Sequence, residues 1–233
     1  MRYSREEIQE KTRESLKINE TLYKQKFINY KSKTTDTGVL CTEIIANEIL
    51  NEIINGKLKI DTFSRNSKSY LTISHQNRPV DINATNREEE KCAKRLFNKK
   101  TLHIGEVIDF QIPLKDKQSD KLGKIDLMTF NQNNLTLYLI ELKYGKNKET
   151  LLRAILEAHT YCEIIDEDKL KNDYNFYEIK KVKPSVMVIG SDCNSYKELE
   201  DINNRPELLK LAKKLNITFF KSADEKTFEM IDL

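Results

Sequence analysis

The sequence predicts an α/β protein in which a central mixed β-sheet is flanked by helices. The first observation is a strand–loop–strand–turn–helix pattern between Gly123 and Ile165. The second is the alternation of helical and strand-like segments after it, which is typical of a sheet covered by helices. The third is the different pattern of residues 1–84, which predicts an N-terminal extension of helices and a hairpin in front of the main region, residues 85–233.

The first predicted helix covers residues 4–30. Ser4 and Glu7 have the spacing of a capping box, in which two side chains satisfy the first backbone donors of a helix. The apolar positions of this segment are few and its basic residues outnumber its acidic ones. A solvated helix packed loosely on the domain is therefore favoured, and a contact with DNA or with a second copy is the alternative.

A second helix is predicted over residues 39–55, because isoleucine and leucine recur there at helical spacing and Gly56 ends the pattern. Its glutamates are expected to face solvent, namely Glu43, Glu48 and Glu52. Residues 57–63 and 69–74 have the pattern of strands on either side of a polar turn. They are expected to form a small hairpin or to extend the main sheet.

A third helix is predicted over residues 85–98, with capping-box spacing between Thr85 and Glu88. Its buried face is expected to contain Cys92, Ala93, Leu96 and Phe97. Glu89 shares this face at the first turn, where a carboxylate is unusual if packing is its only role. Glu89 is therefore a candidate site residue, and the neighbouring glutamates at positions 88 and 90 are the alternatives.

The most informative pattern is a hairpin of residues 124–130 and 135–144. In the second strand, the period of two places Glu141 and Lys143 on the same side. Asp126 lies inside the first strand between two apolar residues, where a carboxylate gains nothing from packing. The hairpin is therefore expected to bring the two carboxylates close enough to share a divalent cation, with the lysine beside them.

A purely structural interpretation competes with the metal site, because strands that end in Glu-x-Lys are common and usually carry a solvated ion pair. Two features favour a functional site. Residues 135–144 are too apolar on both sides for a solvated sheet edge, and a second carboxylate, Asp126, lies at hairpin distance.

A basic turn and a helix follow the hairpin. Thr150 is expected to cap a helix over residues 151–165. Lys146, Lys148 and Arg153 lie in or near the turn and could hold a phosphate backbone. The remaining predicted elements are strands at 105–114, 185–189 and 217–220, and helices at 196–203 and 206–215.

The sequence resembles the PD-(D/E)xK nuclease superfamily in three features that occur in order. These are an aspartate in one strand, Asp126, the pair Glu141 and Lys143 on the next strand, and the helix that follows. The resemblance covers roughly residues 85–220 and implies a restriction-endonuclease-like core. It implies Mg²⁺ or Mn²⁺ bound by Asp126, Glu141 and the Leu142 carbonyl oxygen, and a lysine that assists the nucleophile or the transition state. It also implies that Glu89 points toward the metal.

The exonuclease-like branch of this superfamily carries Gln-x-x-x-Tyr in the helix after the hairpin. This chain has Glu157 and Tyr161 at that spacing, so the branch stays open. The resemblance implies a metal-dependent endonuclease that acts on DNA, for which a homodimer is common. The alternatives are a nuclease-like fold that only binds nucleic acid or protein, and a structural protein with an ion pair on its sheet.

Composition bounds the class of protein. The net charge of +3 is too small to indicate nucleic-acid binding by itself, so any basic surface must be local. The four cysteines form no CxxC pair, the N-terminal segment has no apolar run, and no stretch has the ~20 apolar residues of a membrane span. We therefore expect a cytoplasmic protein without a membrane association. The heavy use of Lys, Asn and Ile predicts a bacterial source.

Overall fold

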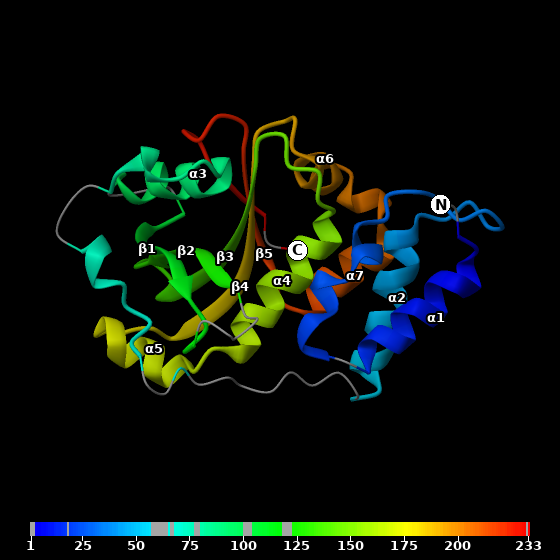
Figure 1. Ribbon diagram of the computed structural model, residues 1–233, viewed down its shortest axis with the longest axis horizontal. Coiled ribbons are helices and arrows are strands. Elements are labelled where there is room, and N and C mark those ends of the chain that lie inside the picture. Colours follow the sequence, from blue (N-terminus) through cyan, green and yellow to red (C-terminus); the bar gives the residue numbers. More distant parts are fainter. Residues whose placement is uncertain are drawn as a thin grey trace.

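The computed structural model describes residues 3–17, 19–56, 65, 68–76, 80–99, 104–117, 123–231 and 233. Within these residues, a six-stranded mixed sheet is flanked by seven α-helices, so the predicted α/β class is confirmed (Figure 1). Among the described helices, none combines the length and apolar character that crossing a membrane requires.

The strands follow one another across the sheet in chain order. They are β1 (Glu106–Pro113), β2 (Lys124–Asn131), β3 (Thr136–Tyr144), β4 (Lys181–Ile189), β5 (Thr218–Ser222) and β6 (Glu229–Ile231). The first three strands form an antiparallel meander, β3, β4 and β5 run parallel, and β6 returns antiparallel at the edge. The predicted hairpin is therefore the middle of the sheet's antiparallel half.

The strand predicted at residues 185–189 is longer in the structure, where β4 begins at Lys181 and contains Pro184. Pro184 pairs with Leu139 of β3, whereas the pairing of β4 with β5 begins only at Ser185. A proline is tolerated in a strand where one side has no ladder to complete, and this explains why the strand extends through it. The short β6 is an element that the sequence pattern did not predict.

After the N-terminal region, α-helices precede β1 and separate β3 from β4 and β4 from β5. The α-helices are α1 (Arg5–Leu16), α2 (Cys41–Ile54), α3 (Glu88–Phe97), α4 (Leu151–Ile164), α5 (Glu167–Tyr174), α6 (Asn194–Glu200) and α7 (Pro206–Lys214). Short 3-10 helices span Asn19–Lys24, Lys26–Asn29, Ile73–His75, Ile82–Ala84 and Ile202–Asn204.

The first helix begins as predicted but ends early. The Ser4 hydroxyl accepts a hydrogen bond from Glu7 N at 3.3 Å, and the Glu7 carboxylate accepts one from Ser4 N at 2.7 Å. The helix stops at Leu16 and does not continue to residue 30, and 3-10 turns take its place. The few apolar residues of this segment provide no continuous helical stripe to bury, which is what a longer helix would need.

The expected hairpin of the N-terminal region is not supported where it can be seen. Residues 57–63 lie outside the described residues, and residues 68–76 contain a 3-10 turn and no strand. The backbone N–H of Tyr70 donates a hydrogen bond to the Asp173 carboxylate at 2.7 Å. Because a side chain of α5 takes this backbone donor, the segment is anchored there and not to a neighbouring strand.

The predicted solvent-facing side of α2 is wrong for two of its three glutamates. Glu43 and Glu48 are buried. Glu48 accepts from Arg13 of α1 at 2.8 Å, and Glu43 accepts from Arg205 at 3.3 Å, next to the start of α7. The helix packs between α1 and α7, so its polar side meets neighbours and not water (Figure 1).

The start of α3 also differs from the prediction. The helix begins at Glu88 with Arg87 at the N-cap, and the Thr85 hydroxyl donates to Glu90 at 3.1 Å in place of a capping box with Glu88. The expected buried face is confirmed for Cys92, Ala93 and Leu96, whereas Phe97 is only half-buried.

The core consists of two hydrophobic clusters, one on each face of the sheet. The period of two in β3 separates them as predicted: Leu137 and Leu139 belong to one cluster, and Ile140 and Leu142 to the other. Helix α3 covers the second face, and α4 with α7, α2 and α1 covers the first (Figure 1). The N-terminal helices therefore share a core with the face on which Glu141 and Lys143 project.

Candidate active site

The hairpin of β2 and β3 brings the sequence-predicted site residues together. Its antiparallel register pairs Leu127 with Ile140, so the next positions along the two strands are Asp126 and Glu141. The Asp126 carboxylate accepts a hydrogen bond from Leu142 N at 3.0 Å, directly beside Glu141. Both carboxylates line one cavity of about 290 Å³.

A residue of β1 holds the other oxygen of Asp126. Gln111 Nε2 donates to Asp126 Oδ1 at 2.8 Å. Gln111 has a φ of 49°, and the register of β1 shifts between Val107 and Asp109, which marks a β-bulge. Bulges often re-aim side chains next to functional sites, and here the irregular backbone places an amide on a site carboxylate.

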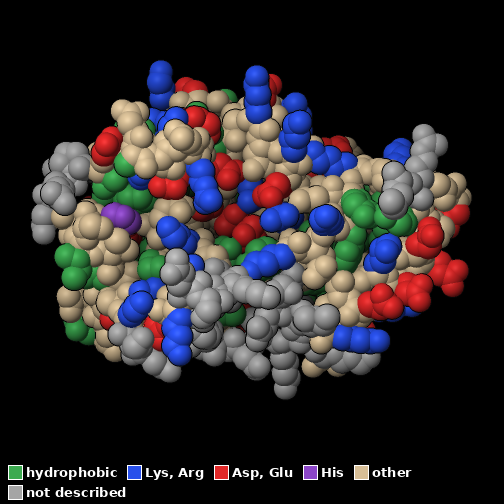
Figure 2. Space-filling view, in the orientation of Figure 1, with side chains coloured by type: hydrophobic (Ala, Val, Ile, Leu, Met, Phe, Trp, Pro, Cys, Tyr) green, Lys and Arg blue, Asp and Glu red, His purple; other side chains and the backbone are tan. Residues whose placement is uncertain are grey.

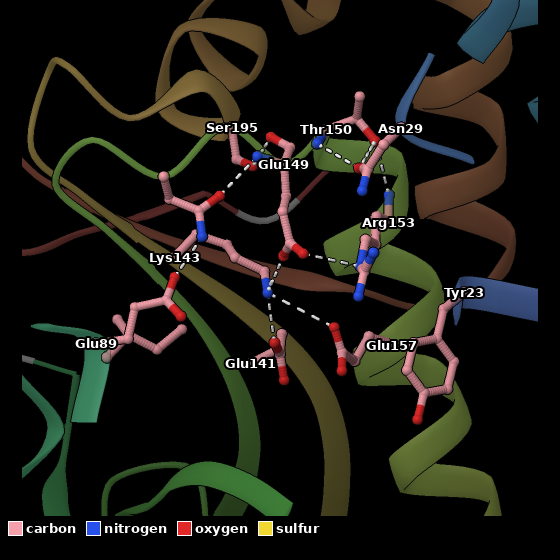
Figure 3. Close-up of polar contacts among 12 residues, drawn as sticks. Tyr23, Asn29, Glu89, Glu141, Lys143, Glu149, Thr150, Arg153, Glu157 and Ser195 are labelled. Carbon is pink, nitrogen blue, oxygen red and sulfur yellow. Dashed lines mark hydrogen bonds and ion pairs between the residues drawn. The ribbon is translucent and has the colours of Figure 1, made fainter. Parts of the chain in front are cut away.

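Lys143 is surrounded by carboxylates (Figure 3). Its Nζ lies 2.7 Å from Glu141, 2.6 Å from Glu149 and 3.6 Å from Glu157. The lysine is 3 % exposed and Glu141 is 5 % exposed, so this network is shielded from solvent. Screening by salt is therefore weak, and the charges interact strongly.

The start of α4 fixes Glu149 in this network. Thr150 is the N-cap, as predicted, and its hydroxyl accepts from Arg153 N at 3.3 Å. The backbone carbonyl of Glu149 accepts from Ser195 Oγ of α6 at 2.9 Å. Because the backbone is held on both sides, the Glu149 side chain is directed at Lys143 (Figure 3).

Arg153, one of the residues expected to hold a phosphate backbone, is paired with a carboxylate. Its Nε lies 3.1 Å from Glu149 Oε1. Glu149 and Glu157 are both four residues away from Arg153, so helical spacing alone does not choose between them. Both glutamates also lie close to Lys143, Glu149 at 2.6 Å and Glu157 at 3.6 Å.

The two residues of the helix motif contact each other. Tyr161 donates its hydroxyl proton to Glu157 Oε1 at 2.7 Å, and Tyr23 donates to the Tyr161 oxygen at 3.4 Å. Burial raises the pKa of both tyrosine hydroxyls, so they remain protonated donors. The chain Tyr23–Tyr161–Glu157 thus orients a carboxylate toward Lys143 from the N-terminal helical region.

Glu89 reaches the same cavity from α3, and Glu90 lines it as well. Glu89 Oε1 accepts from Asn147 Nδ2 at 2.5 Å and from Tyr144 N at 3.4 Å, at the end of β3. Burial raises the pKa of the Glu89 carboxyl group. The third alternative, Glu88, is exposed and pairs with Lys91 at 2.8 Å, away from the cavity.

Basic side chains surround the acidic floor of the cavity. Arg87, Lys115 and Lys124 line it, and Lys146 and Lys148 are exposed on the turn after β3. Figure 2 shows carboxylates in a hollow in the middle of this face, with lysine and arginine side chains around it. The small net charge of the chain therefore coexists with a local basic rim, as the sequence required of any nucleic-acid binder.

The carboxylates are difficult to ionise together. Burial raises the pKa of Asp126 to about 7. Burial and the neighbouring Asp126 charge raise the pKa of Glu141 well above its usual range. Burial alone would lower the pKa of Lys143, but the carboxylates around it outweigh burial and hold its pKa well above the ordinary value. Lys143 is thus a fixed cation at every working pH.

The donor atoms of this cluster fit a hard divalent cation. Within the described part of the chain, no group of three Asp, Glu, His or Cys side chains encloses a metal position by itself. Asp126 and Glu141 nevertheless present oxygen atoms, the ligand type that Mg²⁺ prefers, and Mg²⁺ usually keeps water ligands beside one or two carboxylates. Their mutual repulsion in a buried place is relieved by an added positive charge.

Three contacts at the site were not predicted from the sequence. They involve positions that the sequence pattern did not single out. Gln111 contacts Asp126, Glu149 contacts Lys143, and Asn147 contacts Glu89. The alternation of β1 did place Gln111 on one face with Asp109, which was a usable signal. The roles of Glu149 and Asn147 depend on the turn geometry before α4, for which the sequence has no comparable sign.

The site combines the buried carboxylates of Asp126 and Glu141, the permanently charged ammonium group of Lys143, and a cavity with a basic rim. This combination suits an anionic substrate that reacts at a centre where negative charge accumulates. Comparison of the chain with protein-family models, with curated proteins and with solved structures found no match.

Proposed function

We propose that this protein is a metal-dependent nuclease with a restriction-endonuclease-like fold, which hydrolyses phosphodiester bonds in DNA. The observation that carries the proposal is the contact of buried Lys143 with Glu141, a carboxylate that lines one cavity together with Asp126. A carboxylate whose pKa is raised by burial, beside an ion pair in a cavity, is a pattern typical of functional sites.

Asp126, Glu141 and the Leu142 carbonyl oxygen would hold Mg²⁺ or Mn²⁺. When bound, the cation polarises the phosphate and lowers the pKa of a water molecule. Lys143 keeps its proton, so it supplies positive charge to the phosphate as negative charge accumulates and does not act as a base. Gln111 holds Asp126 in position, and Glu89 lies near enough to order a water molecule at the cavity.

The basic rim supports a nucleic acid as the substrate. Lys146 and Lys148 are exposed and can each neutralise one phosphate. Arg153 is half-buried and paired with Glu149, so its contribution to phosphate binding is expected to be smaller. Two such sites would cut both strands of a duplex in one binding event, and a homodimer would supply them.

A second candidate is a nuclease-like fold that binds nucleic acid or protein without cleaving it. The observation that favours it is the complete engagement of Lys143, whose ammonium group is in contact with three carboxylates. In an active site, at least one of these contacts must be released for Lys143 to reach a phosphate. The two candidates share the binding step and differ in hydrolysis.

The test is cleavage of supercoiled circular DNA and of linear duplex DNA with Mg²⁺ or Mn²⁺. Wild type is compared with Asp126→Asn and Lys143→Ala, and with two matched surface controls, Asp168→Asn and Lys213→Ala, both exposed residues. We expect cleavage of the circle by wild type and both controls, and at least a 100-fold loss in both site variants.

Each other outcome has a meaning. Cleavage of the linear substrate alone would indicate an exonuclease, and cleavage of RNA alone would change the substrate. Binding of DNA and of Mg²⁺ without any hydrolysis would favour the binding module. If calorimetry detects no Mg²⁺ binding and no nucleic acid is cut, the nuclease proposal is wrong and the cluster is an ion pair inside a sheet.

A further inference from the structure

A second cavity of about 620 Å³ adjoins the first, which has about 290 Å³. The two share three lining residues, Glu90, Gln111 and Lys124. One of these, Gln111, also donates to Asp126. A ligand that extends out of the carboxylate cavity past Gln111 therefore enters the second cavity.

A histidine lines this second cavity and is held from two sides. His75 Nδ1 lies 2.7 Å from Asp109 Oδ1, and the imidazole stacks on the Phe110 ring with centroids 3.9 Å apart. The side chain of Asp109 is completely buried, whereas that of His75 keeps 16 % of its surface exposed. A carboxylate thus fixes an imidazole at the wall of an open cavity.

The partners of Asp109 determine which nitrogen of His75 carries a proton. Asp109 accepts from Phe110 N at 2.7 Å and from the Tyr174 hydroxyl at 2.6 Å. Since the carboxylate is surrounded by donors, His75 Nδ1 is assigned as a further donor. Among the described residues, Nε2 of His75 has no hydrogen-bond partner and is left for a ligand.

The backbone of β1 is irregular close to Gln111, which lines both cavities. The β-bulge lies at Val107 and Asp109, and Gln111 adopts a φ of 49°. A non-glycine residue with positive φ is strained and persists where the surrounding structure enforces it. Here the irregular backbone directs Asp109 to His75 and Gln111 to Asp126, one anchor for each cavity.

We propose that His75 binds a phosphate group of the substrate strand, adjacent to the phosphate that is cleaved. This inference rests on the proposed nuclease function. In its protonated form, the imidazole donates from Nε2 to a phosphate oxygen while Asp109 balances its charge from Nδ1. Lys124 is exposed at the shared rim and adds a second cation, whereas Lys94 is paired with Glu90 at 3.2 Å.

A phosphate contact makes specific demands on the binding measurements. It contributes equally for every base sequence, because phosphates carry no sequence information. It also depends on salt, since each neutralised phosphate contributes about one to the slope of log affinity against log salt concentration. If His75 had a purely structural role, replacing it would change neither the salt slope nor the dependence of binding on one particular phosphate.

The experiment measures binding of labelled duplex oligonucleotides by fluorescence anisotropy in EDTA, which prevents cleavage. His75→Gln is compared with wild type and with His159→Gln, a matched control on α4. We expect His75→Gln to weaken binding about tenfold for every sequence and to reduce the salt slope by about one. The control variant should bind as wild type does.

A second variant protects the test against misfolding. Tyr174→Phe removes one donor from Asp109 and leaves the Asp109–His75 pair intact, so a smaller loss of affinity is expected with an unchanged salt slope. Melting temperatures establish that each variant is folded. Replacing one backbone phosphate at a time by a neutral methylphosphonate then locates the contact: one position next to the cleaved bond should weaken wild type and leave His75→Gln unaffected.

The outcomes separate this proposal from the nuclease proposal. If wild type cuts and binds DNA while His75→Gln matches it in affinity, salt slope and methylphosphonate profile, the His75 contact is wrong and the nuclease stands. If wild type binds no Mg²⁺ and neither cuts nor binds any nucleic acid, with Mg²⁺ or in EDTA, both proposals are wrong.

Discussion

Gly123 and Tyr161 compete for one space, because the Tyr161 hydroxyl lies where a β-carbon on residue 123 would be. Gly123 directly precedes β2, three residues before Asp126, and both Gly123 and Tyr161 line the carboxylate cavity. The missing side chain thus makes room for the hydroxyl that donates to Glu157. The hairpin and α4 are fitted to each other at the mouth of the site.

Replacing Gly123 by alanine is therefore expected to displace the tyrosine ring. Overpacking of a buried contact lowers the free energy of unfolding by about 1–3 kcal/mol. Loss of the Tyr161–Glu157 hydrogen bond should also reduce cleavage, because Glu157 is then free to approach Lys143 more closely. Denaturant unfolding and the plasmid assay measure the two effects.

The double variant Gly123→Ala with Tyr161→Phe serves as the control, since it removes the hydroxyl that clashes most. It should recover part of the lost stability relative to Gly123→Ala. Equal stability of wild type and Gly123→Ala would contradict the close packing of these two residues.

Glu157 offers a test of how the acidic cluster sets the pH dependence of the reaction. Its charge helps to raise the pKa of Asp126 and of Glu141. Glu157→Gln removes that charge but keeps an oxygen that can accept from Tyr161. Both carboxyl groups then ionise at lower pH, so the acidic limb of the cleavage rate profile should move to lower pH.

The matched control for this variant is Glu163→Gln, on the same helix but about half exposed and outside the cavity lining. Its rate profile should overlay that of wild type. A Glu157→Gln profile that does not move, or moves to higher pH, would show that Glu157 does not influence the reacting carboxylates.

The sequence predicts the centre of the site because two simple periodicities converge there. The period of two in β3 places Glu141 and Lys143 on one face, and the hairpin places Asp126 beside them. Thr150 is recognisable as the cap of α4 from its position before an apolar helical pattern. These features are local, so neighbouring residues are sufficient to predict them.

The rest of the site depends on contacts between distant segments. Gln111 reaches Asp126 because a bulge re-aims β1, and Glu149 reaches Lys143 because α6 holds its backbone. Glu43 is buried because a second helix covers the polar side of α2. Periodicity describes one element at a time and therefore carries no information on which partner will cover it.

The burial of Glu43 leads to a prediction about stability away from the cavity. Glu43 accepts from Arg205 and from two backbone N–H groups at the start of α7, Glu207 N at 2.9 Å and Leu208 N at 3.4 Å. Glu43→Ala removes the nearer carboxylate partner of buried Arg205 and leaves Glu198 at 3.9 Å. Breaking a buried ion pair costs about 3–5 kcal/mol of unfolding free energy. Denaturant unfolding measures the loss.

Glu43→Gln should be less harmful than Glu43→Ala, because its amide oxygen can still accept from the helix start. Glu10→Ala, at an exposed position of α1, should change stability by less than about 0.5 kcal/mol. If Glu43→Ala is as mild as Glu10→Ala, the contact with Arg205 does not hold α2 and α7 together.

The raised pKa of Asp126 predicts that the free energy of unfolding depends on both pH and bound metal. Its pKa is raised to about 7 in the folded protein, above the ordinary value of 3.8 for an unfolded chain. The folded state therefore favours the protonated form, and the associated stability is complete below pH ~3.8 and is lost as the pH rises through ~7. Asp126→Asn cannot ionise, so at pH 8 without metal its free energy of unfolding should exceed that of wild type by up to roughly 4 kcal/mol, and its melting temperature should be higher. At pH 4 the two proteins should have nearly equal stability.

Added Mg²⁺ should raise the melting temperature of wild type at pH 8 and leave that of Asp126→Asn nearly unchanged. A wild-type protein that is more stable than Asp126→Asn at pH 8 without metal would mean that Asp126 contributes as an ordinary structural carboxylate.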